Sequence, residues 1–368
     1  MKSITKPTLL IQPAISHRNI QRMIQKAKDS NSELRPHFKT HQSLAIGKWF
    51  KNYNIHKIAV SSVEMAEFFA KDGWNDITIA FPLNPNEITQ INRLAEENQI
   101  HLTLLNEESI HFLNHNLSNR VGVFIEIDTG YKRSGVSYNQ ESFIQKMIDQ
   151  IQESKKMELK GFISHAGHTY KTSSKEEILK IHQEENTNLN KLKYSLGNLP
   201  PDFILSTGDT PSCSIAEDFR TIDEMRPGNF VFYDVQQAEL GSCSLSDIAI
   251  CLACPVIAKY KERNEMVVHG GAIHFSKEFL IKDNQQIFGY TVELTDSGWK
   301  ITEENGILTK LSQEHGTLKV PEYFFDKYDV GDFIGILPIH SCLTANLMGQ
   351  YMDPGGYWYD HFAGTIKG

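Results

Sequence analysis

The sequence has few cysteines and no excess of positive charge. Its 368 residues include five cysteines, and the formal net charge at pH 7 is -8. A sparse, odd set of cysteines fits a reducing compartment rather than a disulfide framework. Clustered Lys and Arg are needed to bind nucleic-acid phosphates. No nucleic-acid partner is therefore expected, although a local cationic pocket for one phosphate is compatible with this charge.

Long apolar runs are also missing. No segment approaches the roughly 20 apolar residues that a membrane helix needs. The N-terminal apolar run is short and interrupted by prolines, unlike a secretory signal. Hydrophobic residues make up 40% of the chain and charged residues 22%, as in an ordinary folded soluble protein. We therefore expect a cytoplasmic protein without a membrane partner.

Short apolar runs alternate with helical patterns up to about residue 240. Within 16–30, for example, Ile20, Met23, Ile24 and Ala27 recur at helical spacing. Strict alternation of strands and helices predicts a parallel sheet, and eight such units predict a (β/α)8 TIM barrel. Proline has no N–H to donate, so Pro36 is awkward inside the first strand. The expected strands are Leu34–Phe38, Lys57–Ser61, Asp76–Ala80, His101–Leu105, Val121–Asp128, Leu159–His165, Asp202–Ser206 and Gly228–Tyr233.

The pattern changes after about Gly241. Five β-rich runs follow, joined by turns with Gly, Asn and Asp instead of helices, which is typical of an antiparallel β domain. These runs are Ile248–Tyr260, Met266–His274, Gly289–Leu294, Ile307–Ser312 and Phe333–Pro338. The sequence therefore predicts a barrel over residues 13–240 and a β domain over residues 241–368, to which residues 1–12 add a strand.

Lys39 directly follows the first expected strand, in the motif ArgProHisPheLysThrHis at residues 35–41. The carboxyl ends of barrel strands are the face where active sites lie. A lysine there can form a Schiff base if its ammonium is desolvated or crowded by other cations. Arg35, His37 and His41 are close in sequence and could crowd it. The alternative is a basic turn at the surface.

A glycine-centred loop with several hydroxyl groups follows the seventh expected strand. Its sequence is SerThrGlyAspThrProSer, residues 206–212. Backbone N–H groups of such a loop can bind a phosphate, and barrels often do so after strands 7 and 8. Similar clusters also form plain turns. Asp209 is a poor neighbour for an anion and is expected to point elsewhere.

Two further strand ends carry polar side chains. SerHisAlaGlyHisThrTyr at 164–170 includes two histidines and Tyr170, which suit hydrogen bonding or acid–base chemistry. A satisfied structural histidine is the alternative for His168. AspThrGlyTyrLysArgSerGly at 128–135 includes Arg133, whose donor fork could hold a phenolate or carboxylate. A surface arginine is the alternative there.

One pair in the expected β domain suits a metal. His340 and Cys342 are two residues apart near the end of a strand, and in a strand such side chains face the same way. Imidazole and thiolate suit zinc, and two protein ligands leave positions for water and substrate. The alternative is a buried cysteine beside a partly exposed histidine. Cys251 and Cys254 lack a second pair or suitable histidines and are interpreted as core residues.

In their order along the chain, these motifs resemble the fold-type III enzymes of pyridoxal 5'-phosphate (PLP). The family in question contains D-serine dehydratase and D-threonine aldolase and is more distantly related to alanine racemase. The resemblance covers nearly the whole chain. ArgProHisPheLysThrHis is similar to the family's Schiff-base lysine motif. HisAlaGlyHisThrTyr, the loop at 206–212 and ArgProGlyAsnPheValPheTyrAsp at 226–234 also match. The family fold, a PLP-binding barrel followed by a β domain, agrees with the prediction from periodicity.

The resemblance implies a role for each candidate residue. Lys39 would carry PLP as a Schiff base and remove or relay the substrate α-proton. Arg133 would lie near the cofactor phenolate and Tyr170 near the pyridine ring. His340 and Cys342 would bind zinc or another divalent metal. The residues implied in cofactor binding are Lys39, Arg133, His165, Tyr170, Thr207, Gly208 and Tyr233, of which Thr207, Gly208 and Tyr233 would hold the phosphate.

The metal pair separates the branches of the family. Its aldolases typically show His-X-Asp, whereas its zinc-dependent dehydratases show His-X-Cys, so Cys342 favours a D-serine dehydratase that yields pyruvate and ammonia. A D-threonine aldolase that yields glycine and acetaldehyde is the alternative. An amino-acid racemase and a PLP-carrier protein are further alternatives, but neither needs the metal pair. The resemblance also implies a small D-amino acid as substrate and a homodimer.

Overall fold

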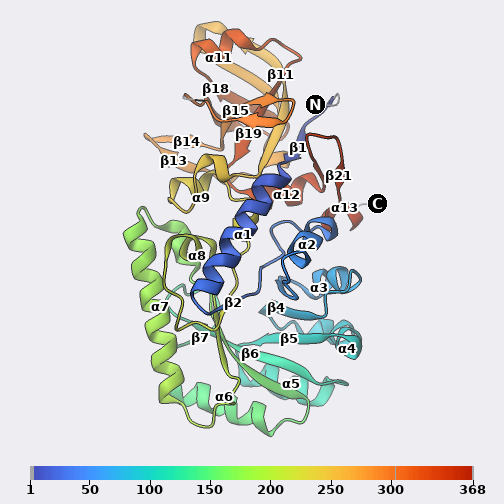
Figure 1. The fold of residues 1–368 in the computed structure, drawn as a ribbon, viewed down its shortest axis with the longest axis vertical. Coiled ribbons are helices and arrows are strands. Elements are labelled where there is room, and N and C mark those ends of the chain that lie inside the picture. Colours follow the sequence, from blue (N-terminus) through green and yellow to red (C-terminus); the bar gives the residue numbers. More distant parts are fainter. Residues whose placement is uncertain (1–3, 303, 367–368) are drawn as a thin grey trace. The chain divides into compact units, whose positions relative to one another are not determined.

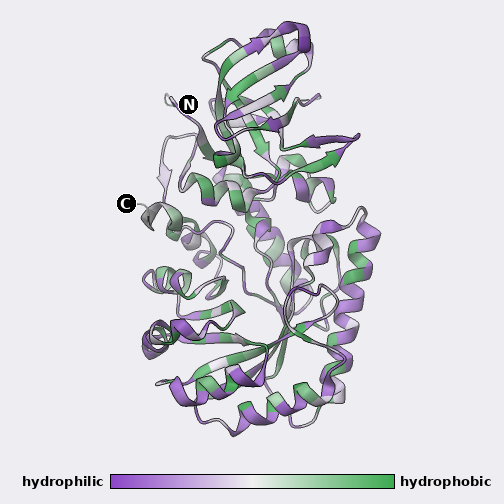
Figure 2. Cartoon of the chain, turned by 180° about the vertical axis from the view of Figure 1, so that it is seen from behind, coloured by the Kyte–Doolittle hydropathy of each residue, from purple (hydrophilic) through white to green (hydrophobic). Residues whose placement is uncertain are grey.

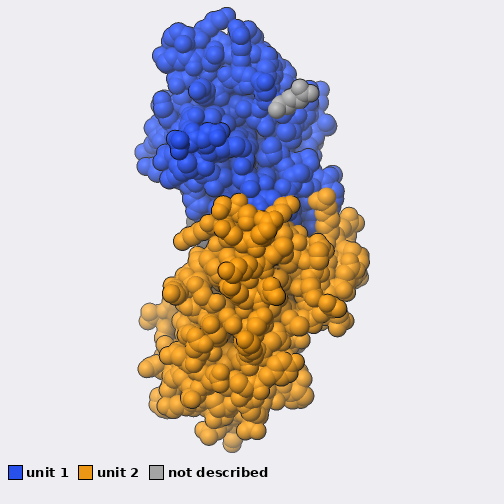
Figure 3. All heavy atoms as spheres, turned by 90° about the vertical axis from the view of Figure 1, so that its left-hand side faces the viewer, with its two compact units in different colours: residues 1–20, 40–49, 229–368 blue, residues 21–39, 50–228 orange. Residues whose placement is uncertain are grey.

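The computed structural model describes residues 4–302 and 304–366. These residues form two compact units (Figure 3). We call residues 21–39 and 50–228 the barrel unit. Residues 4–20, 40–49 and the described residues from 229 onward form the β unit. Both units therefore combine stretches that are distant in the sequence.

Eight parallel strands form the main sheet of the barrel unit (Figure 1). Their order is β2-β10-β9-β8-β6-β5-β4-β3, and the short β7 (Val136–Ser137) pairs with β6. A parallel bridge between His37 and Ala59 joins the chain after β2 to β3. The ring is thus nearly closed, and the predicted (β/α)8 barrel is confirmed. The bounds are β2 (Glu33–Leu34), β3 (Lys57–Val60), β4 (Asp76–Pro82), β5 (Gln99–Leu104), β6 (Val121–Asp128), β8 (Met157–Ile163), β9 (Ile204–Thr207) and β10 (Glu224–Met225).

Helices alternate with these strands. In α6, the buried residues Ile144, Met147, Ile148 and Ile151 recur at i, i+3, i+4 and i+7, which makes one apolar face, and this helix packs against β8. Figure 2 shows the same mixture of hydrophilic and hydrophobic residues on the other helices of this unit. The bounds are α3 (Val63–Ala70), α4 (Ile88–Glu97), α5 (Glu107–Asn116), α6 (Glu141–Glu153), α7 (Lys175–Ser195) and α8 (Thr210–Ile215). Two further helices, α1 (Pro13–Asp29) and α2 (Leu44–Lys51), contain residues of both units.

The eighth strand lies earlier than predicted. It is Glu224–Met225, whereas residues 229–231 of the expected strand Gly228–Tyr233 form a 3-10 turn. A charged residue opens the true strand, so it does not stand out as an apolar run. Glu224 is buried because it pairs with Arg35 at 2.7 Å. Pro227 has no N–H for the ladder and helps to end the strand.

A largely antiparallel sheet dominates the β unit. Its order is β12-β18-β17-β15-β19-β11-β1-β20-β21, and β12 also pairs with β11, so the first six strands form a closed ring. β1 (Thr8–Ile11) pairs antiparallel with β11, with Thr8 opposite Ala253. The other bounds are β11 (Ile250–Tyr260), β12 (Glu265–His269), β15 (Gly289–Thr295), β17 (Ile307–Leu311), β18 (His315–Lys319), β19 (Phe333–Pro338), β20 (Tyr351–Met352) and β21 (Trp358–Tyr359).

Each predicted β-rich run after residue 241 overlaps one strand of this sheet. The run Met266–His274 was predicted too long, because the strand ends at His269 and the short helix α10 (Ala272–Phe275) follows. Cys251 and Cys254 are fully buried in β11, as expected for core residues, and burial raises the pKa of both thiols. The remaining elements are the hairpin β13 (Leu280–Lys282) and β14 (Gln285–Ile287), β16 (Gly298–Lys300), and the helices α9 (Val235–Glu239), α11 (Glu322–Lys327), α12 (Ser341–Met348) and α13 (Phe362–Ile366).

Candidate functional site

Lys39 lies at the carboxyl end of the barrel strands, directly after a residue that is packed in the core. The preceding residue, Phe38, is fully buried, and its ring packs 5.1 Å from Phe50, 4.9 Å from Phe69 and 5.0 Å from Trp74, centroid to centroid. Its backbone N–H donates to the carbonyl of Ala59 at 2.9 Å. Lys39 itself is exposed. The motif therefore anchors one residue in the core and directs the next one, the lysine, outward.

Several predicted residues of the barrel unit lie close enough for their charges to shift one another's pKa. Burial and, after it, the charges of Lys39, Arg133 and Arg226 together lower the pKa of His165 to about 3. The same three cations lower the pKa of His37, again after burial. The two histidines are therefore neutral near pH 7. Lys39, Arg133 and Arg226 thus lie within electrostatic reach of His37 and His165.

The loop at 206–212 has the features of an anion cradle. Gly208 has φ +130°, and a Cβ there would lie 2.8 Å from the backbone nitrogen of Arg226, so only glycine fits. Among the described residues, no hydrogen-bond partner meets three buried hydroxyls, those of Thr207, Thr210 and Ser212. Buried polar groups are rarely left unpaired. These three hydroxyls therefore fit an external ligand with acceptor oxygens, such as a phosphate.

Two neighbours complete this loop. The hydroxyl of Tyr170 accepts a hydrogen bond from the backbone N–H of Thr210 at 3.3 Å, so Tyr170 lies beside the loop. Asp209 points elsewhere, as predicted. Its carboxylate accepts from the Ser212 N–H at 2.9 Å and from the Thr169 hydroxyl at 2.8 Å. Asp209 thus caps α8 and leaves the hydroxyl groups to the candidate ligand.

Arg226 is a buried cation that the sequence prediction gave no role. It follows β10 and donates from Nε to the Ser206 hydroxyl at 2.7 Å, and from Nη2 to the carbonyl oxygens of Ser206, at 3.0 Å, and of Ser164. Its position directly after the eighth strand would have marked Arg226 as a site residue. The strand was expected at Gly228–Tyr233, however, which places Arg226 before it. Arg226 thereby fixes the ends of β8 and β9, from which His165 and Thr207 project.

Glu185 was also missed, because it sits in the middle of the long helix α7 with no motif around it. The Ser164 hydroxyl donates to its carboxylate at 2.8 Å. Burial and, after it, the charge of Asp209 raise the pKa of Glu185 to about 7. The barrel unit therefore holds a carboxyl group that gains or loses its proton near neutral pH.

The predicted metal pair lies at a junction of strand and helix in the β unit, not within a strand. β19 ends at Pro338, His340 is the N-cap residue of α12, and Cys342 lies in its first turn. The side chains of His340 and Cys342 are close enough to interact electrostatically. The Cys342 thiol also donates to the Thr40 hydroxyl at 3.4 Å and accepts from the Asn229 amide at 3.5 Å.

Each member of this pair alters the ionisation of the other. Burial raises the pKa of Cys342, but the hydrogen bond and charge of His340 outweigh burial, so the pKa lies below its ordinary value. Burial lowers the pKa of His340, but hydrogen bonds to Cys342 and Glu278 raise it to about 11. A thiolate and an imidazole held together in this way are a suitable donor set for zinc.

Asp234 holds the first turn of α12 in place and was not predicted. It is buried, and its carboxylate accepts from the Ser341 N–H at 3.0 Å, the Ser341 hydroxyl at 3.2 Å and the Asn229 amide at 2.7 Å. The sequence did offer a signal: the segment 229–234 is apolar except for Asn229 at its start and Asp234 at its end. This segment therefore supports the residue between His340 and Cys342.

Tyr233 belongs to the β unit, whereas the other residues predicted to bind the cofactor belong to the barrel unit. It is 6% exposed, and its backbone has φ +49°, which is uncommon for a residue other than glycine. Its N–H donates to the Asn229 carbonyl at 2.7 Å. The contact predicted between Tyr233 and a phosphate stays a prediction.

A second group of potential metal ligands is less suitable. Among the described residues, His269, His274 and Glu314 form the one group of three whose ligand atoms lie within 4.8 Å of one another. All three are partly exposed. The Gly271 N–H donates to Nδ1 of His274 at 3.1 Å, so the neutral ring carries its proton on Nε2. Neither nitrogen of His274 then offers a lone pair to a metal.

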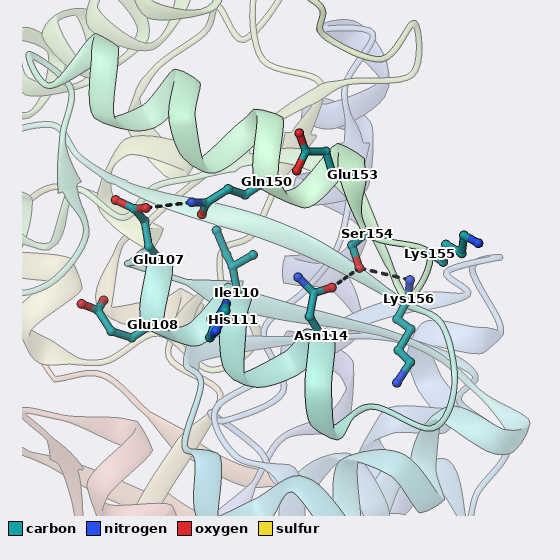
Figure 4. A pocket seen from close by; sticks show the side chains of 10 residues that line it. All are labelled: Glu107, Glu108, Ile110, His111, Asn114, Gln150, Glu153, Ser154, Lys155 and Lys156. Carbon is teal, nitrogen blue, oxygen red and sulfur yellow. Dashed lines mark hydrogen bonds between the residues drawn. The ribbon is translucent and has the colours of Figure 1, made fainter.

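A hollow of about 860 Å³ lies between α5 and α6 (Figure 4). Its side chains bond to one another. The Gln150 amide donates to Glu107 at 2.8 Å, and the Ser154 hydroxyl donates to Asn114 at 2.5 Å. None of the predicted site residues lines it, so it is not a candidate active site.

In the described part of the chain, no helix is long and apolar enough to cross a membrane.

Two domain families match the chain. Residues 12–235 match the alanine racemase N-terminal domain, and residues 249–352 match the putative serine dehydratase domain. D-serine dehydratase of Dictyostelium discoideum is 28% identical over 382 residues, which covers 95% of this chain and 93% of that protein. D-threo-3-hydroxyaspartate dehydratase of Delftia sp. (strain HT23) is 26% identical over 361 residues, which covers 95% and 94%.

Solved structures agree with this fold. The structure of the Delftia dehydratase has a TM-score of 0.88 at 24% identity, with 98% of both chains covered. A D-threo-3-hydroxyaspartate dehydratase with a cysteine replaced by alanine, in the metal-free form, has a TM-score of 0.89 at 24% identity over 98% of both chains. D-threonine aldolase from Filomicrobium marinum has a TM-score of 0.79 at 20% identity, with 97% of this chain and 94% of that chain covered.

Proposed function

Because the chain belongs to the alanine racemase N-terminal domain family, we propose that it is a PLP- and zinc-dependent lyase of small 3-hydroxy D-amino acids. Its most suitable reaction is the conversion of D-serine to pyruvate and ammonia. The observation that carries this choice is that His340 and Cys342 lie together at the start of α12, where His340 lowers the pKa of Cys342. The relatives named D-serine dehydratase and D-threo-3-hydroxyaspartate dehydratase support a lyase.

The residues of the barrel unit fit PLP. When bound, the cofactor supplies an electron sink for the charge left by the broken Cα–H bond. Lys39 would hold it through its amine and take or relay the α-proton at Nζ. The unpaired hydroxyls of Thr207, Thr210 and Ser212 would donate to its phosphate, beside Gly208. Arg133 would face its phenolate oxygen. The other proposed cofactor contacts are His165, Tyr170 and Tyr233.

His340 and Cys342 would hold the metal. Zinc accepts nitrogen and thiolate ligands and, with two protein ligands, keeps positions open for substrate. Hydroxide is a poor leaving group, and a Lewis acid on the β-hydroxyl supplies the stabilisation that its departure needs. A metal-free form was solved for the related D-threo-3-hydroxyaspartate dehydratase, which supports a metal for this chain as well.

A D-threonine aldolase is the second candidate. The structural similarity to D-threonine aldolase from Filomicrobium marinum favours keeping it. There the metal would help a base remove the proton of the β-hydroxyl, and the Cα–Cβ bond would break. A racemase or a PLP-carrier protein needs no metal, and the pair His340–Cys342 speaks against both.

Four further statements are proposals on the same basis. The barrel domain covers residues 13–240, and the β domain covers residues 241–368 together with a strand from residues 1–12. The enzyme forms a homodimer and works in the cytoplasm. Light scattering tests the homodimer, and cell fractionation tests the location in the cytoplasm. Limited proteolysis tests the domain boundary at residue 240.

Purified, PLP-loaded protein incubated with D-serine and with D-threonine, each with and without a chelator, tests the proposed function. We expect pyruvate and ammonia from D-serine, lost with the chelator and restored by zinc. Glycine and acetaldehyde from D-threonine, with no product from D-serine, would make the enzyme an aldolase. Interconversion of D- and L-amino acids with no other product would make it a racemase.

A further inference from the structure

The side chain of Glu278 is bonded to His340. Its carboxylate Oε2 lies in hydrogen-bond contact with Nδ1 of the imidazole. Glu278 lies in the β unit between α10 and β13, and its backbone N–H donates to the Ser276 hydroxyl at 3.2 Å, which fixes the start of this segment. Half of the Glu278 side chain is exposed, against about a quarter of the His340 side chain. Glu278 therefore contacts the candidate metal pair from the solvent side and is no part of the core.

The position of this contact on the ring decides what Glu278 can do. A carboxylate accepts hydrogen bonds, so Nδ1 of His340 donates its proton to Glu278, and Nε2 is the nitrogen that is left to release its proton and bind a metal. The two nitrogens lie on different edges of the imidazole. A carboxylate bonded to Nδ1 thus cannot also bind a metal held at Nε2. Histidines that ligate a metal commonly donate their other N–H to a carboxylate, which orients the ring and makes it a better ligand.

We propose that Glu278 is the positioning residue of the metal pair: it holds Nδ1–H of His340, so that Nε2 is the ligand atom, and strengthens metal binding without binding the metal itself. This inference rests on the metal role proposed for His340 and Cys342. It adds a third residue, distant in sequence, to a pair that the chain order alone defines as His-X-Cys.

Glu278 and Asp234 support the pair in different ways. Asp234 is buried and bonds to the backbone N–H of Ser341 and to the backbone N–H of Gln237, so its replacement endangers the fold of α12. Glu278 is half exposed and acts on a side chain. Replacing Glu278 should therefore leave the fold intact, which makes it the better residue to test.

Metal affinity provides the test, independently of turnover. Zinc binding to the PLP-loaded protein would be measured by competition with a coloured chelator for the wild type, E278Q, E278A and C342A. We expect E278A to bind zinc about 10–100-fold more weakly, in the range usual for outer-shell partners of metal ligands. E278Q, which keeps an acceptor oxygen but loses the charge, should fall between E278A and the wild type. The metal-free proteins should melt at the same temperature and keep the visible absorbance of bound PLP.

A matched control is E262Q. Glu262 lies on the surface of the same unit, where it pairs with Arg263 at 3.1 Å, and its replacement should leave zinc affinity unchanged. Cobalt binding adds a second readout, because a cobalt–thiolate band reports Cys342 as a ligand. The band should persist in E278Q and disappear in C342A.

The outcomes separate the two proposals. Wild-type zinc affinity in both E278Q and E278A, with affinity lost in C342A, would overturn the role of Glu278 and leave the proposed function standing. Unchanged zinc affinity in C342A would overturn the metal pair itself, and with it the metal role in the proposed function. Loss of the cobalt–thiolate band in E278Q would also overturn the inference, because Glu278 would then determine whether the thiolate binds at all.

Discussion

The two candidate sites differ in how their polar groups are satisfied. In the barrel unit, the hydroxyls of Thr207, Thr210 and Ser212 are buried without a partner among the described residues. In the β unit, Glu278 bonds to His340, and Asn229 and Thr40 bond to Cys342. An unpaired buried hydroxyl costs free energy until a ligand accepts from it. The barrel site is thus arranged for a ligand from outside, whereas the metal pair is oriented in advance by its own neighbours.

Removing Lys39 should have the largest effect and should act on the barrel site alone. Lys39→Ala removes the amine that holds PLP and moves the α-proton. Turnover of D-serine should therefore fall by about 10³-fold or more, because proton transfer alone contributes about 10²–10⁴-fold. The visible absorbance of lysine-bound PLP should vanish, while zinc affinity should stay. Lys28→Ala, at an exposed position of α1, is the control. An unchanged spectrum in Lys39→Ala would show that another group holds the cofactor.

Removing Cys342 should act on the metal pair alone. Cys342→Ala removes the thiolate that would hold the metal. A metal that stabilises the leaving oxygen contributes several kcal/mol, so its loss should lower turnover by about 10²-fold or more. PLP absorbance should persist. Cys243→Ala in the same unit is the control for loss of a thiol. Full activity of Cys342→Ala in the presence of a chelator would remove the metal from the mechanism.

The unpaired hydroxyls predict an unusual combination of effects. Thr207→Val keeps the shape of the side chain and removes a buried hydroxyl without a protein partner. The cofactor-free protein should therefore be at least as stable as the wild type, whereas PLP should bind about 10–100-fold more weakly, because a hydrogen bond to a charged group contributes about 1.5–3 kcal/mol. Urea unfolding and PLP titration measure the two effects.

Thr169→Val provides the opposite case in the same unit. The Thr169 hydroxyl donates to Asp209 at 2.8 Å, so its loss should lower the free energy of unfolding by about 1–2 kcal/mol and leave PLP affinity nearly unchanged. If Thr207→Val were the destabilising one of the two, the hydroxyl of Thr207 would have a protein partner after all.

The smallest effect concerns pH. Burial raises the pKa of Glu185 to about 7 from an ordinary value of 4.5, so between these values the folded state holds a proton that the unfolded state has released. Stability should therefore fall as pH rises from about 4.5 to about 7, and then level off. Glu185→Gln should flatten this slope, by on the order of 1–3 kcal/mol. Chemical unfolding at pH 5 and pH 8 measures it, and an equal slope in both proteins would show that Glu185 ionises normally.

Periodicity predicted the barrel well and its first and last strands poorly. The first strand, expected at Leu34–Phe38, is Glu33–Leu34, ahead of Pro36. The last strand is Glu224–Met225. Both short strands begin with an acidic residue, and Arg35 beside them is buried through ion pairs to Glu224 and Asp76. Hydrophobic patterns cannot detect a segment whose burial depends on a charged partner far along the chain.

The same limit applies to the supporting residues of both sites. Lys39, His340 and Cys342 belong to short motifs, so local sequence indicated them. Glu185 and Glu278 have no motif, and each matters only through a side chain distant in sequence, Ser164 for Glu185 and His340 for Glu278. Only the folded chain brings such partners together, so single-sequence inspection provides no signal for them.

The division of the chain between the two units has a consequence for synthesis on the ribosome. Strand β1, near the N-terminus, pairs with β11, with Thr8 opposite Ala253, and β2 pairs with β10, with Leu34 opposite Met225. The first strand of each sheet therefore waits for a partner that leaves the ribosome much later. Such distant pairings slow folding and expose strand edges meanwhile. Of these two strands, β1 has the more distant partner, so its edge stays unpaired longer during synthesis.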